Sequence, residues 1–119
     1  MGVKEEIEAQ WDMLNDPKCW AEKLIPLYLD DAVIAVGGVG VMKKADAAKF
    51  FADIADKYTM AGYSLDDVTE LGNDWAVVRG SGVSKEKATD KEIKSWFVTV
   101  CKKVDGKWMI HTDASFETK

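Results

Sequence analysis

Residues 94–116 read KSWFVTVCKKVDGKWMIHTDASF, two largely apolar stretches joined by Asp105-Gly106. An Asp-Gly pair between such stretches is a strong signal for a two-residue β-hairpin turn. With these two residues as the turn, Val104 lies opposite Lys107, and the pairing continues residue by residue along both strands. The stretch therefore predicts a long antiparallel hairpin near the C-terminal end of the chain.

Alternation along this hairpin divides its side chains between two faces of a sheet. One face would carry two polar residues, His111 and Asp113, among apolar residues of both strands. The other residues of this face would be Trp96, Val98, Val100, Met109 and Ser115. The opposite face would carry Phe97, Thr99, Cys101, Trp108, Ile110, Thr112 and Ala114. A one-residue error in the turn would swap these partnerships.

The chain before the hairpin changes from helical to strand-like spacing. Apolar residues recur at three- and four-residue intervals over 3–14 and 45–58, which predicts two amphipathic helices. Between these helices we expect a short helical segment, kinked by Pro26, and a strand at 32–36. Further strands are expected at 63–71, 75–83, 94–104 and 107–116. Helices first and strands later indicate one α+β domain over 1–119, with the helices packed on one face of a curved antiparallel sheet.

The composition argues against several classes of protein. The formal net charge is −5, with acidic and basic residues interspersed. Without clustered lysines and arginines the chain is a poor candidate for binding nucleic acid or an anionic membrane. We recognise no signal peptide and no membrane-spanning stretch, and expect a cytoplasmic protein. Cys19 and Cys101 lack the spacing of a metal site, so we expect two reduced thiols and no metal. The glycines of 37–40 fit no nucleotide-binding loop, and no cofactor is expected.

Both faces of the predicted hairpin are apolar enough to need cover. The helices can bury one face, and a second copy of the same sheet would bury the other. We therefore expect a homodimer joined through the outer face of the sheet. The alternative is a sheet that curls tightly enough for its own ends to provide the cover.

Three stretches in this order resemble the nuclear transport factor 2-like superfamily: LYLDDAVIAVGG at 27–38, AAKFFADIA at 47–55 and DGKWMIHTDASF at 105–116. The nearest resemblance is to its SnoaL-like branch, which includes domains related to the calcium/calmodulin-dependent kinase II association domain. The resemblance implies a cone-shaped α+β roll, a curved sheet wrapped around the N-terminal helix and enclosing an apolar pocket. It also implies pairing of two copies through the outer sheet. It is unspecific for function, because one scaffold can host many activities.

The chain departs from the ketosteroid isomerase branch of that superfamily. The catalytic residues of that branch would fall near Val36, near Val98 or Thr99, and near Gln10 or Trp11. None of the three is kept, and steroid isomerisation by that mechanism is not expected, since an apolar side chain accepts no proton. His111 and Asp113 do match the recurrent Ile-His-x-Asp of the SnoaL-like branch.

Two functions compete at this point. The first is a pocket for a small apolar or aromatic ligand, extended in one version to a cofactor-independent lyase or isomerase with His111 and Asp113 as catalytic residues. Its ligand-binding residues would be Trp11, Tyr28, Tyr58, Arg79 and Trp96. Core packing is the alternative for the aromatic residues, and structural or interface roles for His111 and Asp113. Arg79 would hold a ligand carboxylate, or would pair with Asp113, Glu70 or solvent. The second function is a non-catalytic homo-oligomerisation or assembly domain.

Overall fold

The structure is a computed structural model of the 119-residue chain, and it describes residues 2–12 and 20–117. The elements in these residues are α1 (Val3–Trp11), α2 (Trp20–Leu24), the 3₁₀ turn η2 (Ile25–Leu27), β1 (Tyr28–Val36), β2 (Gly40–Lys43), α3 (Lys44–Lys57), β3 (Tyr58–Gly72), β4 (Trp75–Glu86), β5 (Glu92–Val104) and β6 (Lys107–Glu117). Within the described ranges, every helix is too short or too polar to cross a membrane.

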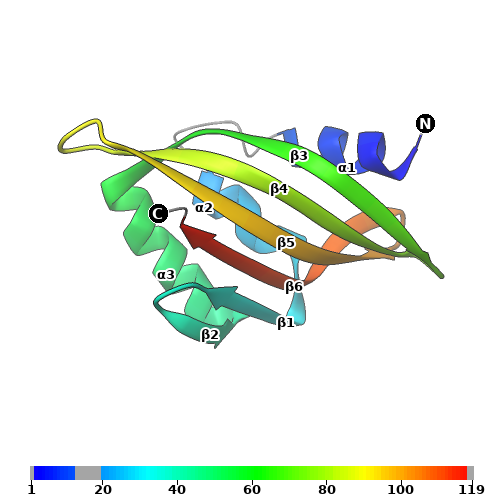
Figure 1. The fold of residues 1–119 in the computed structure, drawn as a ribbon. Helices are drawn as coiled ribbons and strands as arrows, with labels where there is room; N and C mark the ends of the chain where they lie inside the picture. Colours follow the sequence, from blue (N-terminus) through cyan, green and yellow to red (C-terminus); the bar gives the residue numbers. More distant parts are fainter. Residues whose placement is uncertain (1, 13–19, 118–119) are drawn as a thin grey trace.

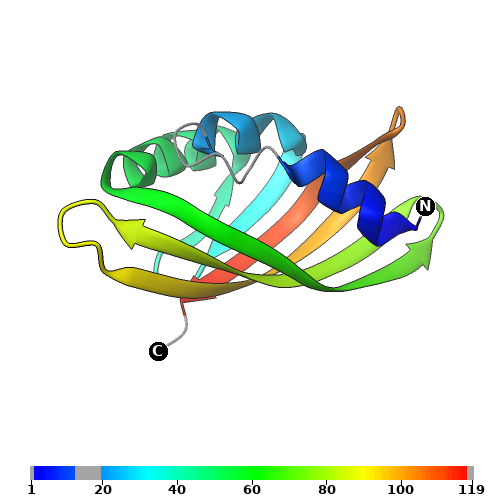
Figure 2. The same cartoon turned by 90° about the horizontal axis from the view of Figure 1, so that it is seen from above.

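The strands form one curved sheet in the order β2-β1-β6-β5-β4-β3 (Figure 1). β1 runs parallel to β6, whereas the other neighbouring strands are antiparallel. Figure 2 shows the labelled helices of Figure 1 on one side of the sheet, across its concave face. The α+β fold with a curved sheet is therefore confirmed, but the sheet is mixed. The prediction of a wholly antiparallel sheet is wrong because β1 joins it beside the last strand.

Helical spacing explains how the helices cover this face. Ile7 and Trp11 of α1, four residues apart, are both buried, as are Ala47 and Phe51 of α3. Residues at this spacing lie one above the other on the same side of a helix. Across from them, the inner face of the sheet contributes Ala32, Ile34, Ala76, Val78, Cys101, Trp108 and Ile110 to the core.

The helix boundaries agree with the sequence at α3 and differ before β1. The helical segment expected around Pro26 ends early, since the chain is already extended at Tyr28. β1 thus begins four residues before the predicted strand 32–36. Asp30 and Asp31 are exposed, and the pairing with β6 shifts between Tyr28 and Val33, so the strand carries these two polar residues outward at an irregularity. The predicted end of the first helix beyond residue 12, and Cys19, lie outside the described residues.

The predicted turn of the last hairpin is confirmed. Asp105 and Gly106 both have positive φ, +52° and +81°, as a two-residue hairpin turn of this type requires. The predicted pairs Val104–Lys107 and Lys103–Trp108 follow directly.

Further from the turn, β6 contains one extra residue. Cys101 lies opposite Ile110 but Val100 lies opposite Thr112, so His111 has no partner in the ladder. Such a bulge reverses the alternation of side chains beyond it. Asp113 consequently lies opposite Thr99 on the inner face. The prediction that His111 and Asp113 share a face is therefore wrong.

Candidate functional site

A hollow of about 230 Å³ lies between the concave face of the sheet and the helices. Its wall consists mainly of apolar and aromatic side chains, with several hydroxyl groups and one carboxyl group. The helices contribute Trp11, Leu24, Phe51 and Ile54. The strands contribute, among others, Tyr58, Tyr63, Phe97, Thr99, Ile110 and Asp113.

Asp113 is the carboxyl group in this wall, and two hydroxyls hold it. The Tyr28 hydroxyl donates to Oδ2 at 2.6 Å, and the Thr99 hydroxyl donates to Oδ1 at 3.0 Å. Both donors are buried, and the Tyr28 ring stacks at 6.3 Å on that of Phe51. The carboxyl group is thus fixed from two sides by residues of β1 and β5, and the residue as a whole is half-buried.

The surroundings of Asp113 act on its ionisation in opposite directions. Burial raises the pKa of Asp113 above its usual value, because the charged form loses water, while the hydrogen bonds from Tyr28 and Thr99 lower it. Burial and the neighbouring Asp113 carboxylate raise the pKa of Tyr28 well above that of a free phenol. Burial, with the same carboxylate, raises the pKa of Cys101 to about 12. A neutral thiol and a neutral phenol therefore surround one carboxyl group.

Trp11 lines the hollow, and its indole N–H is a buried hydrogen-bond donor. Its side chain is 3% exposed, and in the part of the chain that the structure describes its indole Nε1–H finds no acceptor. An unsatisfied buried donor costs free energy, so such atoms call for an explanation.

The neighbouring Gln10 anchors α1 on β6: its Nε2 donates to the Trp108 carbonyl at 2.6 Å, and its Oε1 accepts from the Trp108 N–H at 2.8 Å.

Four of the predicted site residues line the hollow: Trp11, Tyr58, Trp96 and Asp113. Trp96 does so from the edge, because 37% of its surface is exposed and Lys94 Nζ lies 5.5 Å from its ring centre. Tyr28, predicted near the mouth, is fully buried and supports Asp113 from outside the lining.

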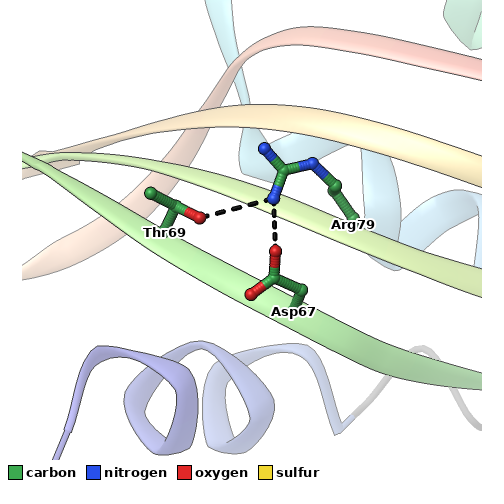
Figure 3. A network of polar contacts seen from close by, with 3 residues as sticks. All are labelled: Asp67, Thr69 and Arg79. Atoms are coloured by element: carbon green, nitrogen blue, oxygen red, sulfur yellow. Dashed lines mark hydrogen bonds and ion pairs between the residues drawn. The ribbon is translucent and has the colours of Figure 1, made fainter.

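His111 and Arg79 lie elsewhere. The His111 ring meets Trp75 edge-on at 5.2 Å, and its Nδ1 lies 2.8 Å from Thr112 Oγ1, on the outer side of the sheet. Figure 3 shows Arg79 binding Asp67 and, at 3.3 Å, the Thr69 hydroxyl. The expectation that Arg79 pairs with a ligand, Asp113 or Glu70 is not met, because β4 presents this side chain away from the helices.

Thr99 and Tyr63 are the residues that sequence reasoning missed. Thr99 was placed on the face without Asp113, an error that follows from the bulge at His111. Tyr63 lines the hollow from β3, and burial, together with Asp12 and Glu8 of the α1 segment, raises its pKa to about 12. Its place in a predicted strand was a signal, but one strand alone does not tell which face is covered.

Comparison with known proteins gives structural matches only: no family model and no curated protein matches the chain. A ketosteroid isomerase-like protein from Erwinia carotovora atroseptica is 20% identical, with a TM-score of 0.78, over 98% of this chain and 94% of that one. A putative calcium/calmodulin dependent protein kinase II association domain from Xanthomonas campestris is 21% identical, with a TM-score of 0.75, over 99% and 89%. An NTF2-like protein of unknown function from Prochlorococcus marinus is 14% identical, with a TM-score of 0.77, over 100% and 95%. The chain therefore has the nuclear transport factor 2-like fold.

Proposed function

We propose that this chain is a small-molecule-binding protein of the SnoaL-like type, with its ligand in the hollow beneath the helices. The main support is the Asp113 carboxyl group, which is fixed by Tyr28 and Thr99 and borders an otherwise apolar space. Small-molecule sites combine an apolar wall with a few oriented polar groups in this way.

Any proton transfer to or from this ligand would use Asp113. Burial gives this carboxyl group a raised pKa, which suits an acid–base group. His111 lies across the sheet and borders no part of the hollow that the described residues form. The lyase or isomerase version of the function therefore depends on Asp113 without the imidazole.

Calorimetric titration with 2-phenylethanol, an uncharged probe with one ring and one hydroxyl, tests the binding function. We expect saturable binding with one ligand per chain. Ser84→Trp would place an indole in the hollow and abolish the signal, whereas Ser64→Trp, at an exposed site of β3, would preserve it. Absence of binding, or equal binding to the Ser84 variant, would overturn the proposal.

A homodimer through the outer sheet face is a second, compatible proposal. Trp96, Val98 and Phe116 are 37%, 39% and 51% exposed, and they lie on neighbouring strands of this face. Contiguous exposed apolar side chains commonly mark an interface between proteins. The non-catalytic assembly function would use this same surface.

Sedimentation velocity tests the dimer. We expect twice the chain mass at micromolar concentration, and a monomer for Val98→Lys, because the substitution brings like charges together across a two-fold axis. Leu71→Lys is the matched control, since Leu71 is also exposed but lies near the far end of β3. A monomeric parent protein would refute the dimer.

A further inference from the structure

Among the described residues, the lining of the hollow includes an acidic side chain but no basic one. Asp113 is its carboxyl group, and among the described residues that line it there is no lysine, arginine or histidine. The nearest arginine candidate, Arg79, is engaged with Asp67 on the other side of the sheet. An anionic ligand would therefore enter an apolar space without a counter-charge, which is unfavourable.

The hydroxyls next to Asp113 are already used as donors. Tyr28 and Thr99 each direct their single proton to a carboxyl oxygen, so both hydrogen bonds favour the ionised form. Burial opposes that form, and no described cationic side chain of the hollow offsets it. A buried carboxylate is stabilised most effectively by a paired positive charge. A cationic group on a ligand would supply such a charge beside Asp113.

Two other features of the wall suit a cation on an apolar body. Aromatic rings of Trp11, Tyr58, Tyr63 and Phe97 border the hollow, and aromatic faces attract cations. The volume of about 230 Å³ limits the body to a small one.

From these observations we infer that the ligand is a small organic cation: an aromatic or otherwise apolar amine whose ammonium group pairs with Asp113. This inference rests on the proposed binding function and assigns its ligand class. Asp113 acts here as the ligand's counter-ion, while Tyr28 and Thr99 are positioning residues that keep both carboxyl oxygens oriented.

Three probes that share one ring test the ligand class: 2-phenylethylamine, 2-phenylethanol and phenylacetate, each titrated into the full-length protein by calorimetry at neutral pH. We expect the amine to bind at least about tenfold more tightly than the alcohol, and the phenylacetate to bind most weakly. Equal binding of amine and alcohol, or tighter binding of phenylacetate, would overturn the amine assignment and leave the binding function intact. If none of the three binds, the binding function falls as well.

Asp113→Asn removes the negative charge of this side chain and keeps its size. This variant should lose the preference for the amine over the alcohol, whatever its absolute affinity for the alcohol. Asp67→Asn removes the same charge on the outer face and should keep the preference. In the parent protein, amine binding should also release protons where Asp113 is partly protonated, seen as heats that depend on the buffer. An amine preference that survives in Asp113→Asn would refute the assignment, and the comparison of probes on the parent protein remains decisive if the variant does not fold.

Discussion

Asp113 shows how competing effects at one residue define the site. Burial disfavours its charge, and two hydroxyl donors favour it. Asp113 lies opposite Thr99 because of the bulge, and β1 brings Tyr28 to its other oxygen. The carboxyl group is consequently well oriented but poorly solvated, a combination that is expensive for folding and useful for binding.

The raised pKa of Asp113 predicts a particular pH dependence of stability. Between the ordinary aspartate pKa, about 3.9, and the raised value, the folded protein retains a proton that the unfolded chain has released. The free energy of unfolding therefore falls as pH rises through this window, by at most about 1.4 kcal/mol per pH unit, and this contribution levels off above it. The side chain of Asp113→Asn cannot ionise, so the decrease in the free energy of unfolding that Asp113 causes should be absent from this variant. Urea denaturation of both proteins over a series of pH values measures the difference.

An exposed acid provides the control for this measurement. Asp74→Asn, in the turn between β3 and β4, makes the same change of charge at the surface. The pH dependence of its stability should resemble that of the parent more closely than that of Asp113→Asn. A difference between parent and Asp113→Asn that stays constant over the whole pH series would contradict the prediction.

At the scale of elements, local sequence signals predict turns and helices correctly, but they do not predict which distant strands pair. The Asp105-Gly106 turn and the spacing of α3 are properties of short segments, and both are confirmed. The extension of β1 to Tyr28 and its parallel pairing with β6 join residues about eighty positions apart. No periodicity within 27–36 indicates such a partner, and the predicted strand therefore begins only at residue 32.

The bulge at His111 accounts for the error in the site. Assigning side chains to the two faces of a sheet assumes that they alternate without interruption. This assignment puts Asp113 on the right face only if the extra residue of the bulge is known. Nothing in the local residue types of 107–116 distinguishes a bulged strand from a regular one. The sequence therefore identifies Asp113 as a candidate site residue, whereas its partners Tyr28 and Thr99 require the three-dimensional register.

Two glycines of β4 predict opposite responses to the same substitution. A Cβ on Gly80 would lie 2.1 Å from the Ser64 carbonyl oxygen and 2.6 Å from the Phe97 ring, so Gly80→Ala should lower the free energy of unfolding by about 1–3 kcal/mol. A Cβ on Gly82 meets its nearest atom at 3.5 Å, and Gly82→Ala should be neutral or slightly stabilising. Chemical denaturation of the pair checks this, and equal stabilities would show that the strands do not approach as closely as described.

The hydrogen bonds of Gln10 hold α1 against β6, and substituting Gln10 measures how much they contribute to stability. Its amide pairs with both backbone groups of Trp108, as a neighbouring strand would. Gln10→Ala should cost about 1–3 kcal/mol, because a backbone donor and acceptor lose their partner. Gln10→Glu keeps the acceptor and loses the donor. Its free energy of unfolding should lie between those of the parent and the alanine variant, or below both if the carboxylate repels the Trp108 carbonyl. Hydrogen exchange at the Trp108 amide would report the same loss, and unchanged protection in Gln10→Ala would contradict this role.

At the scale of the molecule, the two faces of one sheet carry different features. Helices lie across the concave face (Figure 2), and the hollow of about 230 Å³ lies between them and the sheet. The convex face exposes Trp96, Val98 and Phe116 together with the Arg79–Asp67 pair. The bulge at His111 links the two, since one extra residue turns Asp113 inward and leaves the imidazole on the convex side. The proposed ligand binding and the proposed dimer would therefore depend on opposite faces of the same two strands, β5 and β6.

Trp96 offers a direct measure of whether two convex faces meet. It is 37% exposed, whereas Trp11 and Trp108 are 3% and 4% exposed, so acrylamide should quench Trp96 much more readily than these two. If dimers form through this face, the readily quenched fraction of the fluorescence should decrease as protein concentration rises, because the partner covers Trp96. Trp96→Phe keeps an apolar ring at the interface and should remove most of that concentration dependence. A quenched fraction that stays constant while sedimentation shows dimers would place the interface on another surface, because the convex face would then be as open to acrylamide in the dimer as in the monomer.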